Sequence, residues 1–204
     1  ENVKEPNLFE EIFRYDWVPV MQFEEDAVEI NRPEEIWITD TTFRDGQQAR
    51  APYEVEQIVQ LYKYLHELGG KKGVIRQSEF FIYSNRDREA VLRCLELGYE
   101  YPQVTSWIRA VKDDFKLVKE LGLKETGILT SASDYHIYLK LGLERKKAAE
   151  NYLEIVDAAL EEGIVPRCHL EDITRADFYG FVIPFVQKLM ERSEESGIPI
   201  KIRA

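Results

Sequence analysis

The sequence has few cysteines and few histidines. Its 204 residues contain only two cysteines and three histidines. Cys94 and Cys168 form no CxxC pair and no zinc-type spacing, which argues against a disulfide-rich fold and against a cysteine-based zinc site. None of the histidines, His66, His136 and His169, forms an H-x-H pair with another. This cysteine usage indicates a reducing, cytoplasmic setting.

Long apolar runs and excess basic charge are also missing. No stretch approaches the roughly 20 apolar residues of a membrane-spanning helix. The first ten residues, ENVKEPNLFE, lack the basic region and apolar core of a signal peptide. The chain has 27 Lys and Arg against 38 Asp and Glu, a net charge of −11. We therefore expect neither nucleic acid nor a membrane surface as a partner.

Most of this acidity lies in residues 1–35. That segment holds eleven acidic and three basic residues, a charge of −8, which leaves −3 for residues 36–204. It also contains Phe9, Phe13 and Trp17, which make it too apolar for a free tail. We predict an acidic N-terminal extension over 1–35, packed on the domain or on a partner subunit, followed by one domain over 36–204.

From residue 36 onward, short apolar runs alternate with helical stretches that end in glycine. The expected strands are 36–42, 73–80, 102–109, 125–131, 164–171 and 198–203. The expected helices are 54–68, 86–97, 113–121, 145–162 and 177–195, with stops at Gly69, Gly98, Gly122, Gly163 and Gly197. This alternation predicts an α/β fold with a parallel sheet.

Two architectures fit this pattern: a doubly wound open sheet, and the first units of a (β/α)8 TIM barrel. A complete barrel takes about 250 residues. The last residues, IPIKIRA, resemble a sixth strand in mid-course, with no helix or polar tail after it. We therefore expect a chain that is truncated after about strand six.

Polar side chains gather where the expected strands end. Arg44 and Asp45 follow the first strand, Arg109 ends the third, and His169 and Glu171 lie near the end of the fifth. Because side chains alternate along a strand, His169 and Glu171 share one face. Both architectures bind ligands at the C-terminal ends of parallel strands, so these residues are candidates for a functional site.

Several of these residues also have a purely structural interpretation. Asp45, in an Asp-Gly dipeptide, fits a surface turn with Arg44 as its ion-pair partner. Arg109 fits a structural cation at a strand end, and His169 fits a hydrogen-bonded core histidine.

The loops after the fourth and fifth strands offer further polar residues. Glu171, together with Asp172, could cap the helix that follows instead of serving a site. Asp134 and His136 are expected on a solvated loop, where we assign them no role.

The stretch TDTTFRDGQQA, residues 39–49, resembles the first-strand signature D-T-T-x-R-D-G-x-Q of a family of metal-dependent TIM-barrel enzymes. That family includes the 2-isopropylmalate, homocitrate and citramalate synthases and the hydroxymethylglutaryl-CoA lyases. TSWIRAVKDD (105–114) and HLEDITRADF (169–178) are similar to their counterparts in the synthases. The resemblance covers 36–204, is nearest to the 2-isopropylmalate synthase branch, and implies a (β/α)8 barrel cut after strand six.

The resemblance also implies roles for the candidate residues. Asp45 would ligate a divalent metal ion, Mg²⁺, Mn²⁺ or Zn²⁺. Arg44 would stabilise developing negative charge, and Glu171 would help to enolise acetyl-CoA. The residues implied to bind a 2-oxo acid are Gln48, Arg109 and His169.

The sequence departs from the family pattern at two places. The family completes its metal site with an H-x-H pair on strand seven, and these residues do not include such a pair. Asp45 is therefore the one clear metal ligand in this sequence. We expect the fragment alone to be inactive. The second strand of the family commonly carries a glutamate in V-I-E-x-G-F. Here VIRQSEFFIY puts Arg76 at that place and Glu79 three residues later. Which of the two serves the site is open.

The activity implied is a Claisen condensation of acetyl-CoA with a 2-oxo acid, in amino-acid biosynthesis, by a cytoplasmic homodimer. One alternative is a lyase that cleaves a hydroxyacyl-CoA at the same site. The other is a non-catalytic module that binds a metal or an acid and associates with a partner through residues 1–35. Release of CoA from acetyl-CoA would separate the first from the other two.

Overall fold

The computed structural model describes residues 22–23, 26–27, 31, 33–109 and 111–204. The chain divides into two units, Glu1–Ile36 and Trp37–Ala204. In the first unit, β1 (Gln22–Phe23) and β2 (Asp26–Ala27) pair in antiparallel fashion. The predicted packing of residues 1–35 falls largely outside the described residues and stays a prediction.

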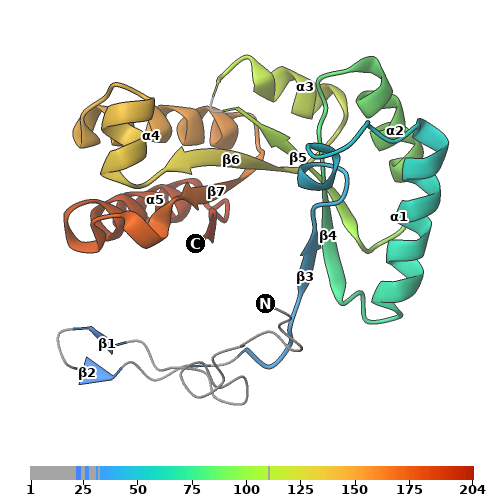
Figure 1. Ribbon diagram of the computed structural model, residues 1–204, viewed down its shortest axis with the longest axis horizontal. Coiled ribbons are helices and arrows are strands. Elements are labelled where there is room, and N and C mark those ends of the chain that lie inside the picture. Colours follow the sequence, from blue (N-terminus) through green and yellow to red (C-terminus); the bar gives the residue numbers. More distant parts are fainter. Residues whose placement is uncertain (1–21, 24–25, 28–30, 32, 110) are drawn as a thin grey trace, which may run out of the picture. The chain divides into compact units, whose positions relative to one another are not determined.

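The second unit is built on one sheet of six parallel strands. They are β3 (Ile38–Asp40), β4 (Ile75–Phe80), β5 (Gln103–Ile108), β6 (Glu125–Ser131), β7 (Val165–Glu171) and β8 (Lys201–Arg203). Each strand pairs with the next in chain order. A doubly wound sheet reverses its strand order, so the (β/α)8 interpretation is confirmed as a half-barrel of six strands (Figure 1).

A helix follows each of the first five strands and lies along the outer face of the sheet (Figure 1). These helices are α1 (Val55–Gly69), α2 (Asn85–Glu96), α3 (Asp114–Glu120), α4 (Arg145–Glu161) and α5 (Ile183–Ser196). The glycines in the left-handed conformation after them are Gly70, Gly98, Gly122, Gly163 and Gly197. The first helix thus runs one residue past its predicted stop.

The last helix begins later than predicted. Residues 178–182 form the π-helix η4 (Phe178–Val182), in which the Asp177 carboxylate accepts the Gly180 N–H at 2.7 Å. Pro184 then lies in the first turn of α5. Proline has a fixed φ and no N–H to donate, which suits a helix start, so the regular helix is delayed to Ile183.

Apolar side chains fill the space between the sheet and the helices. Ile108 of β5 and Ile128 of β6 are fully buried with Tyr62 and Val91 of the helices. Burial of one such aliphatic side chain contributes about 1.5–3 kcal/mol. Because strand side chains alternate, the opposite, inner face of the same strands is left to polar and charged residues.

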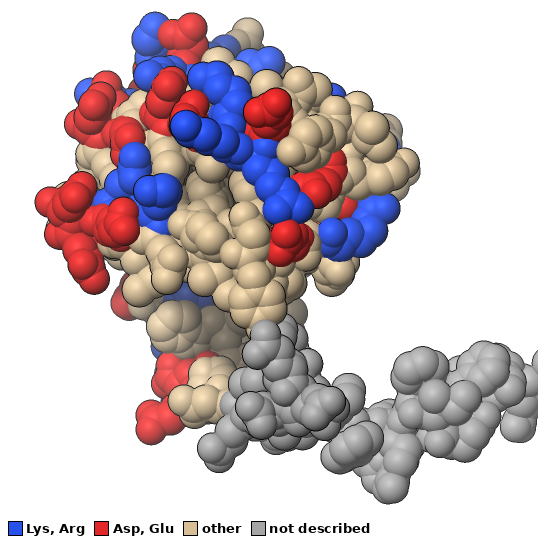
Figure 2. Space-filling view, turned by 90° about the vertical axis from the view of Figure 1, so that its left-hand side faces the viewer, with Lys and Arg blue, Asp and Glu red and all other residues tan. Residues whose placement is uncertain are grey.

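The surface of the described residues mixes charges of both signs. On the face in Figure 2, Lys and Arg side chains lie beside Asp and Glu, with no field of one sign. No helix in the described part of the chain is long and apolar enough to span a bilayer. The predictions of a cytoplasmic location and of no nucleic-acid partner stay predictions.

Candidate active site

The inner face of the sheet carries a network of buried charges centred on Glu79. Arg44 donates from Nε and Nη2 to its Oε2 at 3.1 and 3.0 Å. Arg167 and Arg203 donate to Oε1 at 2.7 and 3.2 Å. Glu79 is 0% exposed. Burying a carboxylate without ion-pair partners is costly, so these three guanidinium groups and Glu79 form a single unit.

This geometry answers the question about the second strand. Glu79 lies in the site, whereas the Arg76 guanidinium stacks between the rings of Trp37 and Tyr101 at 4.4 and 4.2 Å. Residues three apart on a strand point to opposite faces, so only one of the two can face inward. Arg76 therefore has a structural role, away from the C-terminal strand ends where the site lies.

The first part of the D-T-T-x-R-D-G motif fastens the end of β3. The Asp40 carboxylate accepts from Thr42 Oγ1 at 2.6 Å and from Ser78 Oγ of β4 at 2.7 Å. A turn over residues 42–44 then leads into the 3₁₀ helix η1 (Asp45–Gln47). Because Asp40 holds the end of β3 against β4, Arg44 can reach Glu79 of β4 on the inner face.

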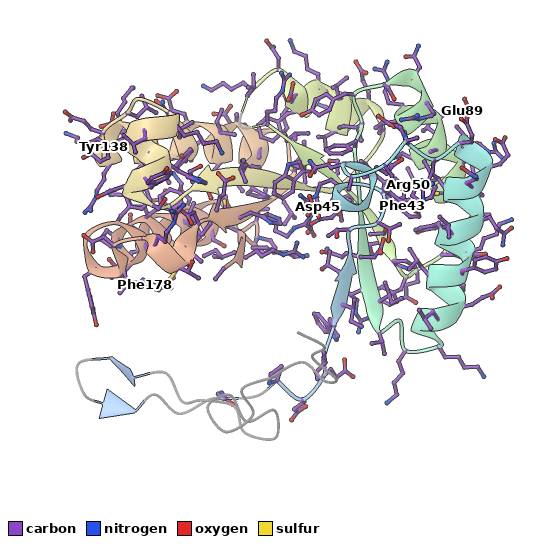
Figure 3. All side chains as sticks on the ribbon, in the orientation of Figure 1. Phe43, Asp45, Arg50, Glu89, Tyr138 and Phe178 are labelled. Atoms are coloured by element: carbon purple, nitrogen blue, oxygen red, sulfur yellow. The ribbon has the colours of Figure 1, made fainter. Side chains whose placement is uncertain are left out.

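Asp45 and Gln48 lie on the exposed side of this turn. The Asp45 side chain is 51% exposed, and its Oδ1 accepts from Arg44 Nη1 at 2.7 Å. Figure 3 shows it beyond the ends of β3 and β4. Gln48 is exposed and makes no side-chain hydrogen bond to another described residue. Its neighbour Gln47 is buried and donates to the Phe43 carbonyl at 2.7 Å, so the two glutamines differ in role.

A metal ion would need more ligands than Asp45 supplies. Within the described ranges, no group of three or more His, Cys, Asp or Glu side chains could hold an ion. Tetrahedral Zn²⁺ and octahedral Mg²⁺ both take several ligands, and one Asp45 oxygen is already engaged by Arg44. These residues therefore do not fit a complete metal site, and we derive no step through a metal.

Trp107 forms the apolar wall of the network. The Arg44 guanidinium carbon lies 4.1 Å from the centre of its ring, and His169 meets it edge-on at 4.2 Å. The Trp107 indole fits here because residue 127 on β6 is glycine. A Cβ at that position would lie 2.5 Å from Cε3 of the indole. The ring thus holds Arg44 and His169 in fixed positions.

His169 is buried and lies inside the network rather than in a separate core. Its Nε2 accepts a hydrogen bond from Arg167 Nε at 3.1 Å. Burial, together with the charges of Arg167, Arg203 and Arg44, lowers the pKa of His169 to about 2. The imidazole is therefore neutral at physiological pH.

Glu171 forms a second cluster, at the ends of β6 and β7. Its Oε2 accepts from Ser131 Oγ at 2.6 Å, His136 Nδ1 at 3.0 Å and Lys140 Nζ at 3.0 Å. His136 and Lys140 come from the π-helix η2 (Tyr135–Lys140). Burial raises the pKa of Glu171, but these hydrogen bonds outweigh burial and hold it below its usual value. The carboxylate is therefore ionised.

The loop residues differ from the predictions in two ways. His136 is not on a solvated loop, because it contacts Glu171; Asp134 stays outside, paired with Arg145 at 2.6 Å. The capping interpretation of Glu171 and Asp172 is wrong. Asp172 makes no side-chain cap and pairs with Arg175 at 2.8 Å.

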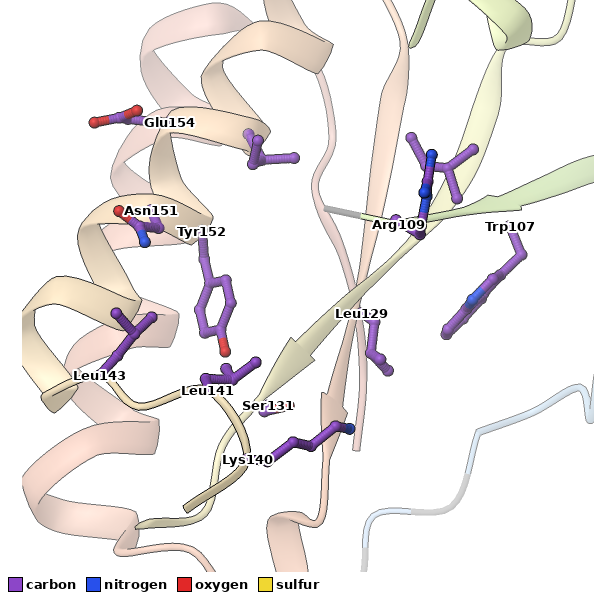
Figure 4. A pocket seen from close by; sticks show the side chains of 12 residues that line it. Trp107, Arg109, Leu129, Ser131, Lys140, Leu141, Leu143, Asn151, Tyr152 and Glu154 are labelled. Atoms are coloured by element: carbon purple, nitrogen blue, oxygen red, sulfur yellow. The ribbon is translucent and has the colours of Figure 1, made fainter. Parts of the chain in front are cut away.

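Arg109 lies apart from both clusters. Its side chain is 69% exposed, and Nε and Nη2 donate to Asp114 at 3.1 and 3.0 Å. It lines a cavity of about 460 Å³ together with Trp107, Ser131 and Lys140 (Figure 4). Of the residues already described, Trp107 of the inner network and two partners of Glu171, Ser131 and Lys140, line this cavity.

The structure thus joins some predicted residues and not others. It brings Arg44, Asp45 and His169 into one network, places Glu171 next to it, and leaves Gln48 and Arg109 outside. Sequence reasoning missed Arg167 and Trp107. Arg167 lies two residues before His169, so the alternation that paired His169 with Glu171 also predicts an inward Arg167.

Comparisons with known proteins agree with this fold and motif. Residues 35–198 match the family model described as HMGL-like. The chain is 62% identical over 202 residues to a citrate (Re)-synthase of Syntrophus aciditrophicus, covering 99% of this chain and 32% of that protein. It is 56% identical over 203 residues to a citrate (Re)-synthase of Clostridium kluyveri, covering 100% and 45%. The chain thus spans less than half the length of these curated relatives.

A solved structure gives the same architecture. The hydroxymethylglutaryl-CoA lyase of Pseudomonas aeruginosa superposes with a TM-score of 0.53 at 20% identity, covering 68% of this chain and 46% of that chain. At this identity the likeness concerns the fold alone. Together with the family match over 35–198, it assigns the half-barrel. The chain belongs to the HMGL-like family.

Proposed function

We propose that the chain is part of an enzyme that condenses acetyl-CoA with oxaloacetate to form citrate. The observation that carries this proposal is the 62% and 56% identity to two citrate (Re)-synthases along nearly the whole chain. Citrate is the product of adding an acetyl unit to the keto carbon of oxaloacetate, so the product defines both substrates. The finer assignment to the 2-isopropylmalate branch is not supported by these relatives.

The reaction forms one carbon–carbon bond and then breaks a thioester. The acetyl methyl group loses a proton, and its carbon attacks the keto carbon of the oxo acid. The keto oxygen becomes an alkoxide and takes up a proton. Water then cleaves the thioester of citryl-CoA, which gives a carboxylate and free CoA thiol. Thiol release therefore reports one complete turnover.

Arg44 and Glu171 are the proposed catalytic residues. Glu79 and Trp107 fix the Arg44 guanidinium, and such a preorganised cation stabilises an enolate or alkoxide as it develops. Glu171 is proposed to accept the methyl proton, a task that needs an ionised carboxylate. Asp45 stays a proposed metal ligand with no step assigned to it.

Arg203 is the guanidinium of this network best placed to pair with a carboxylate of the acceptor. Three guanidinium groups converge on Glu79, and Arg203, at 34% side-chain exposure, is the most accessible of them. Guanidinium groups bind carboxylates in a fork geometry, which suits the carboxylate that every 2-oxo acid carries. Substrate contacts by Gln48, Arg109 and His169, and a homodimer, stay proposals.

The test is CoA-thiol release by the protein at its full native length. Acetyl-CoA is combined in turn with oxaloacetate, 2-oxoisovalerate and pyruvate, the acceptors that correspond to citrate, 2-isopropylmalate and citramalate. We expect the highest kcat/KM with oxaloacetate. Replacing Arg44→Lys should lower kcat by about 100-fold, since a fixed fork of donors is lost.

A matched control is Arg50→Lys, because Arg50 is exposed and stacks on Tyr53 outside the network. It should leave kcat unchanged. Equal losses in both variants, or no thiol release with any acceptor, would overturn the proposal. Cleavage of hydroxymethylglutaryl-CoA in the absence of thiol release would favour the lyase instead.

A further inference from the structure

Arg167 is the most fully bonded side chain of the inner network. It is 4% exposed, and all three of its nitrogens donate to protein atoms. The acceptors are His169 Nε2, Gln77 Oε1, Glu125 Oε1, Glu79 Oε1 and Thr105 Oγ1. A guanidinium has five N–H donors and no acceptor, so this arrangement uses its whole capacity.

The bond to His169 determines where the imidazole carries its proton. Arg167 Nε always donates, so Nε2 of His169, 3.1 Å away, has to accept. A neutral imidazole has one donor and one acceptor nitrogen, which puts the proton on Nδ1. A second proton on Nε2 would face an N–H of Arg167, with the charges of Arg203 and Arg44 also nearby.

The Nδ1 side of His169 remains available. Within the described part of the chain, Nδ1 donates a hydrogen bond to no acceptor. Nδ1 is also not one of the fully buried polar atoms without a hydrogen-bond partner. The edge-on contact with Trp107 at 4.2 Å fixes the plane of the ring. Glu79, the nearest carboxylate to Nε2 at 3.8 Å, is already bonded to three arginines.

We propose that Arg167 is a positioning residue that fixes His169 as its Nδ1–H tautomer, so that His169 donates one hydrogen bond to an oxygen of the bound 2-oxo acid. This inference rests on the proposed function for the identity of the ligand, but not for the tautomer. The ligand atom that faces His169 must be an acceptor, a carboxylate or keto oxygen, and a protonated amine is rejected there.

The first test is nitrogen-15 NMR of the full-length protein labelled at histidine. In the unaltered protein, Nδ1 of His169 should be protonated and Nε2 unprotonated from pH 8 to pH 5, and oxaloacetate should shift the Nδ1 signal. With Arg167→Met, Nε2 loses its donor, so the tautomers should mix and His169 should titrate. Arg167→Lys, which retains a donor, should restore the Nδ1–H form in part.

A kinetic test separates this role from a merely structural one. His169→Asn keeps a donor near the Nδ1 position, whereas His169→Leu removes it. We expect KM for oxaloacetate to change less than about 3-fold in the first and to rise about 10-fold in the second, the value of one hydrogen bond. Arg192→Met, which removes an arginine bonded to Asp157 on the outer helices, should alter neither KM nor the His169 signals.

The outcomes distinguish the two proposals. A titrating or Nε2-protonated His169 in the unaltered protein overturns the Arg167 inference, whatever the enzyme's activity. If thiol release fails but the tautomer is as stated, the proposed function fails and the positioning role of Arg167 stands. Should Arg167→Met not fold, Arg167→Lys and the two His169 variants decide the matter.

Discussion

Glu79 orients other side chains without lying where a ligand would bind. It is 0% exposed and is enclosed by Arg44, Arg167 and Arg203. Leaving a buried charge without its partner costs about 3–5 kcal/mol, so the four groups keep each other in place. The orientation of Arg44 therefore depends on a carboxylate one strand away.

At Gly127, adding a single methyl group should already have a large effect on stability. With Gly127→Ala, the added Cβ would lie 2.5 Å from the Trp107 indole and 3.3 Å from Arg167 Nη2. The indole cannot retreat freely, because it packs against Arg44 and His169. We expect a loss of about 1–3 kcal/mol in the free energy of unfolding, measured by urea denaturation.

The control for this prediction removes the obstacle instead of adding one. In a Trp107→Leu background the six-membered ring is gone, so Gly127→Ala should cost less than about 0.5 kcal/mol there. An equal cost in both backgrounds would mean that the effect arises from the β6 backbone and not from the indole.

At this scale the sequence predicts part of the site. Arg44 and Glu171 could be found because a long motif and a strand end mark them. The different roles of Gln47 and Gln48 could not, because they depend on how a 3₁₀ turn rotates two adjacent side chains. The partners of Arg167 come from strands up to 90 residues away, and such contacts leave no local pattern.

Among elements, the regular ones follow from local pattern and the irregular ones do not. The strand expected over 164–171 is found as Val165–Glu171, since apolar and β-branched residues mark it. The π-helix η2 (Tyr135–Lys140) is not predicted. Its conformation is tied to contacts of His136 and Lys140 with a residue 35 and 31 positions away, which a window along the sequence does not contain.

The attachment of η2 to Glu171 gives a prediction for catalysis. Lys140 Nζ donates to both Glu171 oxygens, at 3.1 and 3.0 Å, and helps to lower the pKa of that carboxyl. Lys140→Met removes this donor, so the pKa of Glu171 rises. If Glu171 is the base, the acidic limb of the pH profile of kcat/KM for thiol release should move to higher pH.

The matched control is Lys147→Met on α4, where the lysine is exposed and lies 3.8 Å from Glu150. Its pH profile should overlay that of the unaltered enzyme. An acidic limb that stays in place in Lys140→Met would exclude Glu171 as the group that titrates.

For the unit Trp37–Ala204 as a whole, the notable property is a charged interior. Barrel interiors are usually filled by layers of branched apolar side chains, whereas this inner face holds Glu79, Glu125 and Arg167 at 0%, 8% and 4% exposure. The strand–helix rhythm alone leaves barrel and doubly wound sheet open, because they differ only in strand order; the resemblance of residues 39–49 to the family signature is what predicts the barrel.

This interior predicts how stability depends on pH. Burial, first, and the charges of Arg167, Arg203 and Arg44 together lower the pKa of His169 from 6.5 to about 2. Below about pH 6.5 the unfolded chain therefore binds a proton that the folded chain does not, and stability falls as pH falls. The loss reaches at most about 2 kcal/mol at pH 5.

Urea denaturation at pH 7 and pH 5 measures this loss. His169→Asn has no imidazole to protonate, so its stability should fall less between the two pH values than that of the unaltered protein. Equal losses would show that His169 titrates normally when folded.

Trp107 also has a photophysical consequence. Its indole lies 4.1 Å from a guanidinium and 4.2 Å from an imidazole, so the emission energy of this fluorophore depends on the electric field of Arg44. Any event that displaces Arg44, such as the arrival of an anion at the strand ends, alters that field and hence the colour of the emitted light. The fluorescence of Trp107 should therefore report displacement of Arg44 directly, without an added label.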